Sequence, residues 1–269
     1  MDFINAIILL SNFVIVPSIT YGSQLALGAI GVTLIYGVLR FANFAYGDLM
    51  AFGTMCVILF TWLLKSWGIS LGILPTALLA LPFGIVLTIG VSLFFDRTVF
   101  EYYRNKKSSP VTFIVVSLGI MFVLNAVVRI IIGPNDIVFM DGARFIISAV
   151  EFRETTGLLE GLTIKSTQVI TIITTSITCY LLFNFLNKTK TGKSMRAYSN
   201  NEDLALLSGI DPNRIILITW IIVSILATIG GTLYGLDKSF KPFTYFNNLL
   251  PIFAATIVGG IGNPLGAFY

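Results

Sequence analysis

Long runs of apolar residues make up most of the chain, and short polar segments separate them. Each run approaches or exceeds the roughly 18 residues that are typical of a membrane-crossing helix. The runs are continuously apolar and do not alternate residue by residue, which favours helices over the strands of a membrane barrel. We therefore predict an all-α polytopic membrane protein with about eight transmembrane helices, at residues 3–19, 22–39, 47–64, 71–95, 110–132, 166–187, 213–236 and 246–269.

The first apolar run, residues 3–39, is too long for one straightforward span. A single helix over its 37 residues would extend about 55 Å, whereas the hydrocarbon core of a bilayer is about 30 Å thick. Pro17, Tyr21 and Gly22 lie near its middle, and such residues commonly interrupt regular structure. We expect a break there, which gives two spans.

Composition supports a membrane location, with 56% hydrophobic and 11% charged residues against about 25% charged in ordinary soluble domains. Basic residues gather in two segments, which eight spans place on the same side: Arg97, Arg104, Lys106 and Lys107, then Lys188, Lys190, Lys193, Arg196 and Arg214. Since positive loops favour the cytoplasm, we assign these segments and the N-terminus to that side. The net charge of +4 then reflects topology and requires no nucleic acid as a partner.

The chain is expected to form one transmembrane domain, residues 1–269, with a cytoplasmic loop at 188–214 and an extracytoplasmic loop at 133–165. The latter carries five acidic and three basic residues. Cys56 and Cys179 lie inside apolar spans, and histidine is absent. Neither a metal site, nor a catalytic set, nor a cofactor is predicted. Asp96 and the adjacent Arg97 are expected to form a surface ion pair worth about 1 kcal/mol or less.

The cytoplasmic loop predicts a short helix with defined ends. Asn200 or Asn201 can cap its start, and Gly209 can close it in a left-handed turn. Glu202 and Asp203 in its first turn interact favourably with the helix dipole. Leu204 and Leu207 give the helix an apolar edge. Asp211, before Pro212, can cap the start of the next span. The helix is suited to pressing into a partner's groove, but a solvated connector fits the pattern equally well. The nearby Gly192, Lys193 and Ser194 imitate a phosphate-binding loop without its first glycine or its preceding strand.

A polar stretch, RFANFAYGDLMAFG at residues 40–53, allows two interpretations. It can be a helix break at membrane depth, where exposed backbone groups are available to a substrate, with Asp48 capping the next helix. It can equally be a tight cytoplasmic turn. A second interruption is expected near the end of the chain. The candidate residues for a translocation path or its gate are Asn43, Tyr46, Gly47, Asp48, Gly259, Gly260, Gly262 and Asn263.

Three blocks of the sequence resemble the permeases of branched-chain amino acid ABC importers, the LivH type. They are YGSQLALGAIGVTLIYGVLRFANFAYGDLMAFG from Tyr21, MRAYSNNEDLALLSGIDPNRIILITWIIVSILATIGGTLYG from Met195, and FAATIVGGIGNPLGA from Phe253. Two features depart from the family pattern. Tyr46 stands where members usually carry a histidine, so no role of that histidine transfers. Members also continue with further membrane segments, so we expect the sequence to be truncated at its C-terminus.

The resemblance implies a permease subunit in a prokaryotic cell membrane, which pairs with a second permease subunit. Two cytoplasmic ATP-binding subunits would supply energy, and an extracytoplasmic binding protein would deliver a branched-chain amino acid; close relatives take urea or short amides. The residues that would couple to the ATPases are Asn201, Glu202, Leu204, Leu207, Gly209 and Asp211.

Two other classes compete with this interpretation. An ion-coupled secondary transporter normally carries acids or histidine inside its spans, and here Asp48 is the one plausible candidate. An intramembrane enzyme would need a nucleophile and a base at matching depth, and neither is found.

Overall fold

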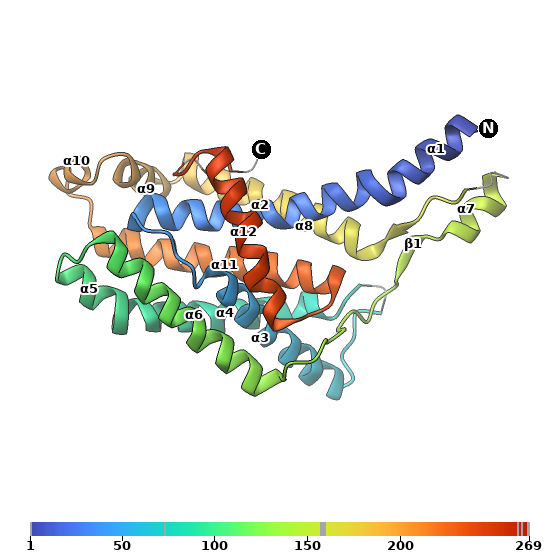
Figure 1. Ribbon diagram of the computed structural model, residues 1–269, viewed down its shortest axis with the longest axis horizontal. Coiled ribbons are helices and arrows are strands. Elements are labelled where there is room, and N and C mark those ends of the chain that lie inside the picture. The colour runs from blue at the N-terminus through green and yellow to red at the C-terminus, as the bar shows by residue number, and fades with distance from the viewer. Residues whose placement is uncertain (1, 73, 157–159, 263, 265, 268–269) are drawn as a thin grey trace.

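The computed structural model is almost entirely helical and describes residues 2–72, 74–156, 160–262, 264 and 266–267 (Figure 1). Helical elements before the polar segment at 133–165 are α1 (Asp2–Leu10), the π-helical turn η1 (Ser11–Ile15), α2 (Val16–Leu39), α3 (Tyr46–Ser66), α4 (Ala77–Phe95), the π-helical turn η2 (Asp96–Phe100), α5 (Glu101–Asn105) and α6 (Pro110–Ile132). Then follow β1 (Phe145–Ile147), α7 (Ala149–Thr156), β2 (Ile164–Lys165), α8 (Ser166–Lys188), α9 (Lys190–Asn200), α10 (Glu202–Leu207), α11 (Pro212–Lys238) and α12 (Pro242–Gly259). The all-α prediction is confirmed; β1 and β2 form one small antiparallel pair.

Six helices in the described part of the chain are long and apolar enough to cross a membrane, compared with about eight spans predicted from the sequence. The six are Phe3–Leu39, Tyr46–Ser66, Ala77–Asn105, Pro110–Ile132, Ser166–Lys188 and Pro212–Lys238. Two of the predicted spans have merged into the first of these, and the last predicted span is not among them.

The first apolar run remains one helix through the expected break. Pro17 has no N–H group, so the carbonyl of Phe13 loses its usual partner four residues later. The helix widens locally over η1, where the N–H of Val16 donates to the carbonyl of Ser11, five residues back. The π-turn thus accommodates Pro17 without a break, and the chain remains regular helix through Tyr21 and Gly22.

This merger places the N-terminus at the other end of the bundle from the one predicted. We call the end that carries α5, α9 and α10 the basic end; β1, α7 and β2 lie at the opposite end, next to α1 (Figure 1). The side chain of Asn12 in η1 binds the segment between α7 and β2. Its Nδ2 donates to the Gly161 carbonyl at 2.8 Å, and its Oδ1 accepts from the Thr163 N–H at 2.9 Å. The assignment of the N-terminus to the side of the basic loops is therefore wrong.

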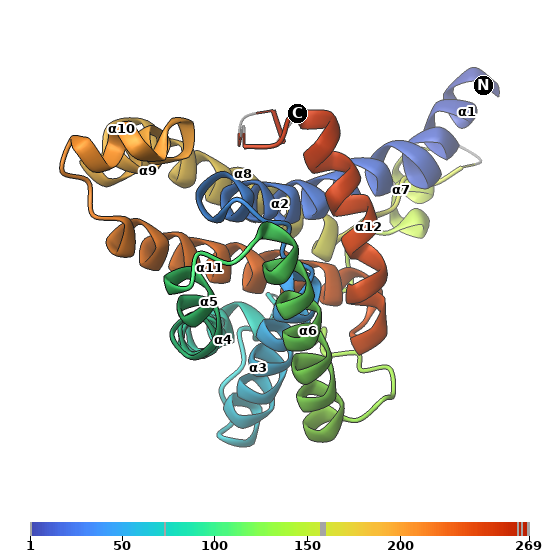
Figure 2. The ribbon, with the colours of Figure 1, turned by 60° about the vertical axis from the view of Figure 1, so that its left-hand side comes forward.

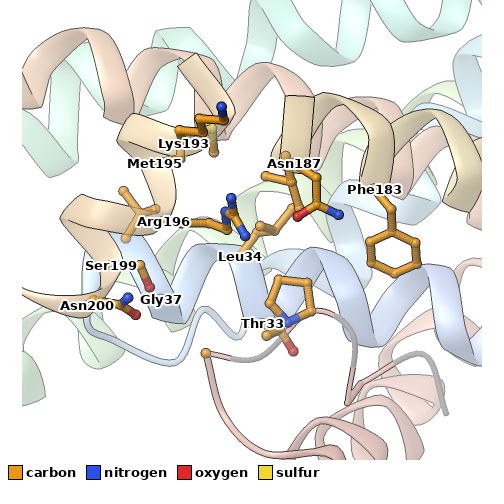
Figure 3. Close-up of a pocket in the computed structure, with 14 residues that line it drawn as sticks. Thr33, Leu34, Gly37, Phe183, Asn187, Lys193, Met195, Arg196, Ser199 and Asn200 are labelled. Atoms are coloured by element: carbon orange, nitrogen blue, oxygen red, sulfur yellow. The ribbon is translucent and has the colours of Figure 1, made fainter. Parts of the chain in front are cut away.

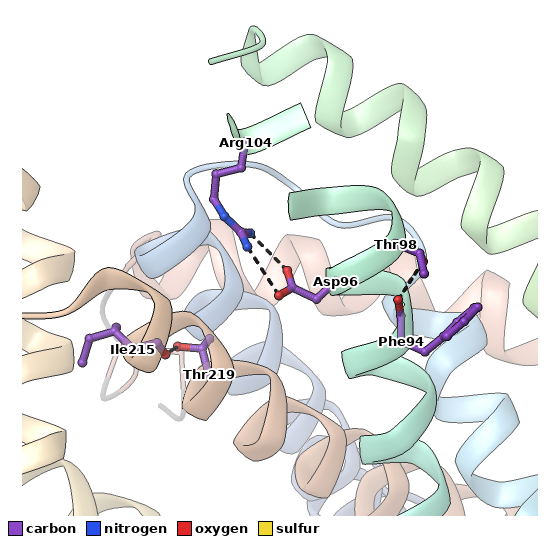
Figure 4. Close-up of polar contacts among 6 residues, drawn as sticks. All are labelled: Phe94, Asp96, Thr98, Arg104, Ile215 and Thr219. Atoms are coloured by element: carbon purple, nitrogen blue, oxygen red, sulfur yellow. Dashed lines mark hydrogen bonds and ion pairs between the residues drawn. The ribbon is translucent and has the colours of Figure 1, made fainter. Parts of the chain in front are cut away.

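The third span also runs further than predicted, because η2 and α5 extend α4 to Asn105. Arg97 and Arg104 are thus helical and not part of a loop. The expected pair of Asp96 with Arg97 is wrong: Asp96 is paired with Arg104, whose Nη1 lies 3.1 Å from Oδ1 (Figure 4). Asp96 is the first residue of η2, and Arg104 lies in α5.

The last predicted span, residues 246–269, is a shorter helix with different ends. Helix α12 begins at Pro242 and ends at Gly259. Asn247, Asn248 and Pro251 interrupt its apolar character, which explains why it falls outside the six spans. It crosses the bundle obliquely and packs on α2, α3 and α6 (Figure 2).

Helix α11 is the centre of the bundle and packs against α2, α3 and α4. Close approach to α3 depends on Gly231, where an added Cβ atom would lie 2.6 Å from Thr54 Oγ1 and 2.7 Å from the Met50 carbonyl oxygen. Several buried hydroxyl groups of α11 bond to their own helix, as Thr219 does to the Ile215 carbonyl at 2.8 Å (Figure 4). Small residues thus set the helix spacing, as is common in membrane bundles.

We expect Gly231→Leu to lower stability by about 1–3 kcal/mol or prevent folding, because the larger side chain has no room between α11 and α3. The matched control is Gly119→Leu on α6, where an added Cβ atom meets nothing within 4 Å. Thermal unfolding of both variants in detergent provides the measurement. Equal melting temperatures would show that α3 and α11 do not approach so closely.

Candidate functional site

The segment between α2 and α3 turns back into the protein interior. Helix α2 ends at Leu39, and Arg40 adopts a left-handed backbone conformation with φ of 61°. The chain then runs without helix to Ala45. Phe41, Asn43 and Ala45 are all buried, so the segment is not a solvent-exposed turn.

Contacts with α6 show how deeply this segment enters the bundle. The N–H of Phe44 donates to Ser117 Oγ at 3.2 Å, about 10 Å along α6 from Pro110 at 1.5 Å per residue. Asp48 contacts Asn125, about 22 Å along the same helix. The non-helical segment thus lies beside the body of a membrane-crossing helix, as the first of the two sequence interpretations expected.

Asn43 forms the turn that starts α3. Its Oδ1 accepts the N–H of Ala45 at 3.0 Å, and its carbonyl accepts the N–H of Tyr46 at 3.4 Å. Asn43 is therefore a turn former, as the second interpretation held, but it is buried inside the bundle. An asparagine side chain is suited to this position because it bonds to the backbone two residues on.

Asp48 does not cap α3, which corrects the sequence prediction. The residue before the helix is Ala45, without a side-chain cap. Asp48 lies in the first turn, is 1% exposed, and accepts a hydrogen bond from Asn125 Nδ2 at 2.7 Å. Its Oδ2 has no hydrogen-bond partner among the described residues. The carboxylate therefore faces α6.

Asn125 was missed by the sequence analysis, although a signal for it exists. It is an amide within the apolar run 110–132, and it precedes Arg129 by four residues. Residues at this spacing share a helix face, so α6 presents an amide and a guanidinium on one side. Arg129 in turn lies near the ring of Phe243 on α12, 5.9 Å from guanidinium carbon to ring centre.

Tyr46 and Gly47 pack the start of α3 against its neighbours. Tyr46 is fully buried, and its hydroxyl would lie only 2.2 Å from a Cβ atom added at Gly31 of α2. A Cβ atom at Gly47 would lie 2.9 Å from the Tyr245 carbonyl oxygen of α12. Gly47 is helical, so its role here is to permit close packing through its small size.

The second interruption lies apart from the first. Helix α12 ends at Gly259, and Gly260 and Gly262 have φ angles of 92° and 85°; Asn263 lies outside the described residues. Gly262 lines a pocket beside the last turns of α2 and α9 (Figure 3). Residues 43–48 instead contact an earlier part of α12, where the rings of Phe44 and Phe253 lie 5.3 Å apart. The structure thus brings the four early candidates together and leaves the late glycines separate.

The loop at the basic end contains the predicted short helix, α10. Asn201 Oδ1 accepts the N–H of Leu204 at 3.0 Å, Gly209 has a φ of 79°, and Asp211 Oδ1 accepts the N–H of Asn213 at 2.9 Å. Leu204 and Leu207 are 60% and 85% exposed. The predicted start, end and apolar edge of this helix are confirmed, and that edge points away from the protein.

Two contacts attach this loop to the bundle. The hydroxyl of Tyr198 donates to Glu202 Oε1 at 2.7 Å, which holds α10 against α9. Burial, followed by the Glu202 carboxylate, raises the pKa of Tyr198, so the hydroxyl stays protonated as the donor. Arg40 Nη2 donates to the Ser199 carbonyl. Arg40, which directly follows α2, is thus bonded to α9.

The structure thus defines a polytopic membrane protein with membrane-crossing helices, a buried polar helix break and a short helix with an exposed apolar edge at one end. Comparison with known families gives a more specific result. Residues 14–269 match the model of the family described as branched-chain amino acid transport system, permease component. The chain belongs to this family.

Individual relatives agree with the family match. The chain is 26% identical over 254 residues to the high-affinity branched-chain amino acid transport system permease protein LivH of Escherichia coli K12, covering 93% of this chain and 79% of the relative. It is 26% identical to the permease BraD of Pseudomonas aeruginosa, with 94% and 80% covered. It is 29% identical to a probable LivH of Methanocaldococcus jannaschii, with 93% and 74% covered. No solved structure matches the chain significantly.

We expect Asp48 and Asn125 to be coupled energetically. Asn125→Leu should destabilise the fold by about 2 kcal/mol, because it leaves a buried carboxylate without its donor. The double variant Asp48→Leu with Asn125→Leu should cost less than the sum of the two single changes. Detergent unfolding of all four proteins gives the coupling free energy. A value near zero would mean that the contact does not contribute to stability.

Proposed function

We propose that this chain is a membrane-spanning permease subunit of an ATP-binding cassette importer, which conducts branched-chain amino acids. It works with a second permease subunit, two cytoplasmic ATP-binding subunits and an extracytoplasmic substrate-binding protein, in the cell membrane of a prokaryote. The family and its named relatives support the transport role and the substrate class. ATP is hydrolysed by the partner subunits.

The exposed leucine edge of α10 is the observation that carries this proposal. A capped helix held by Glu202 and Asn201 is rigid, yet Leu204 and Leu207 extend away from the bundle with nothing of this chain covering them among the described residues. Large exposed apolar side chains at such a position mark an interaction site. We assign this edge to the groove of an ATP-binding subunit, with residues 188–214 in the cytoplasm and residues 133–165 outside.

Movement of the docked helix would reach the buried helix break through Arg40. The contacts run from α10 through Glu202 and Tyr198 to α9, and from Ser199 of α9 to Arg40. Arg40 is followed directly by the buried Phe41, whose ring stacks on Phe113 of α6 at 5.1 Å. ATP-driven displacement of α10 would thereby shift residues 41–48.

Residues 41–48 act as a gate in this proposal. Tyr46 and Asp48 are buried among α2, α3, α6 and α12 and offer no open surface to a solute. Asp48 and Asn125 would become accessible when the segment moves, and a carboxylate there suits the ammonium group of an amino acid. Gly259, Gly260 and Gly262, which lie away from Asp48, are assigned to flexing at the basic end.

Vesicle transport tests the proposal as a whole. Proteoliposomes that contain both permeases and the ATP-binding subunits should accumulate leucine when ATP and the binding protein are supplied, and permeases alone should not. Uptake without the ATP-binding subunits, driven by a proton or sodium gradient, would instead identify a secondary transporter. Preferred uptake of urea or a short amide would correct the substrate.

The docking role of α10 predicts that Leu204→Asp with Leu207→Asp uncouples transport from ATP hydrolysis. Both side chains are exposed, so folding should be unchanged while ATP-driven uptake falls by tenfold or more, as expected for loss of two apolar anchors worth about 1.5–3 kcal/mol each. Val150→Asp on α7, an exposed apolar residue at the opposite end, is the control. Equal ATP-driven uptake by the double leucine variant and by Val150→Asp would contradict the docking assignment.

The transmission role of Arg40 predicts that Arg40→Gly lowers the uptake per ATP hydrolysed. Glycine accepts the backbone conformation but removes the bond to Ser199. Lys107→Gly is a matched control, since Lys107 also has a positive φ, 50°. We expect a normal ratio of uptake to ATP hydrolysis in Lys107→Gly. In Arg40→Gly this ratio should fall about tenfold, because a charged hydrogen bond worth about 1.5–3 kcal/mol is lost. Identical ratios of uptake to hydrolysis in the two variants would rule out transmission through this side chain.

A further inference from the structure

A pocket of about 490 Å³ opens at the basic end between α2, α8, α9 and the segment after α12 (Figure 3). Its floor is apolar and includes Leu34, Val38 and Leu186. Its rim is polar, with Lys193 and Arg196 on α9 and Asn187 at the end of α8. The pocket is therefore amphipathic. Of the described translocation candidates, Gly262 lines it, whereas Asn43, Tyr46 and Asp48 do not.

The charges of this pocket select for an anion. Lys193 and Arg196 lie three residues apart on α9, on one helix face, and neither has an ion-pair partner among the described residues. The described residues that line the pocket include no carboxylate. A zwitterionic amino acid would find no counter-charge for its ammonium group, whereas a phosphate diester would be matched by two cations and the Asn187 amide.

A buried hydroxyl group inside the pocket gives a second, independent indication of a ligand. Thr33 is fully buried and lines the pocket, yet its Oγ1 has no hydrogen-bond partner among the described residues. Several other buried threonines bond to the carbonyl four residues back, as Thr54 does to Met50. Five buried threonines have no such partner among the described residues, and Thr33 is the one of them that lines this pocket. For Thr33 that carbonyl belongs to Ala29, and it is approached by Thr256 Oγ1 at 3.4 Å. Unpaired buried hydroxyls are costly, so a ligand atom is the expected partner.

The position of the pocket suits a lipid. Asn187 lies in the last turn of α8, where a membrane-crossing helix meets the interface. The apolar floor, which includes Leu34, Val38 and Leu186, lies beside these polar groups and can accommodate an acyl chain. Basic pockets between membrane helices on the cytoplasmic side are known to hold anionic headgroups.

We propose that this pocket binds one anionic phospholipid, with its phosphate at Lys193 and Arg196, a headgroup or ester oxygen at Thr33, and an acyl chain on the apolar floor. A free phosphate shares the headgroup chemistry but would leave the apolar floor unused. The lipid lies where α9 meets the bundle, so it fills the space between the coupling loop and α2.

The test is titration of the purified permease complex in neutral detergent with phosphatidylglycerol and with phosphatidylcholine, read by native mass spectrometry. We expect one phosphatidylglycerol to bind in preference to phosphatidylcholine. Lys193→Ala with Arg196→Ala should weaken its binding about thirtyfold, since each basic residue near an anionic headgroup contributes about fivefold. Thr33→Val, which keeps the shape and removes the hydroxyl, should weaken it about fivefold.

The matched control is Lys188→Ala with Lys190→Ala, which removes the same charge from the same loop outside the pocket. It should leave phosphatidylglycerol binding unchanged. A loss equal to that of the pocket variant would show a general surface attraction and overturn the proposal. Displacement of the lipid by millimolar inorganic phosphate would also overturn it, because the ligand would then be a free anion. Equal binding of both lipids would overturn it as well.

Discussion

Backbone groups inside a membrane must find hydrogen-bond partners within the protein, and the segment between α2 and α3 depends on this constraint. The N–H groups of Phe44 and Ala45 are satisfied by the side chains of Ser117 and Asn43. These two bonds permit a non-helical turn in the interior, and the turn places Tyr46 and Asp48 at the start of α3. The gate that we propose exists because two polar side chains replace the bonds that a helix would supply.

Much of the fold was readable from the sequence, because long apolar runs have few structural solutions in a bilayer. The caps of α10 and α11 were predicted correctly because Asn201, Gly209 and Asp211 act on their own neighbours. Predictions from local sequence failed where one residue is compatible with two backbone structures. Pro17 can break a helix or widen it, and here the π-turn η1 widened it, which changed both the number of spans and the end at which the chain begins.

The candidate site was predictable in composition but not in arrangement. Asn43, Tyr46, Gly47 and Asp48 are adjacent in sequence, so their proximity was assured. The partner of Asp48 was not, because Asn125 lies 77 residues away and only tertiary packing brings α6 to α3. Tertiary packing also separates the late glycines from the early break, since the oblique path of α12 carries Gly262 to the end of α2.

The left-handed backbone at Arg40 has an energetic consequence. A residue with a Cβ atom in that conformation is about 1–2 kcal/mol less stable than in the right-handed region, and the side-chain bond to Ser199 offsets a cost of this size. The bond and the strain are therefore of similar size, and loss of the bond would leave the left-handed backbone at Arg40 without compensation from this side chain.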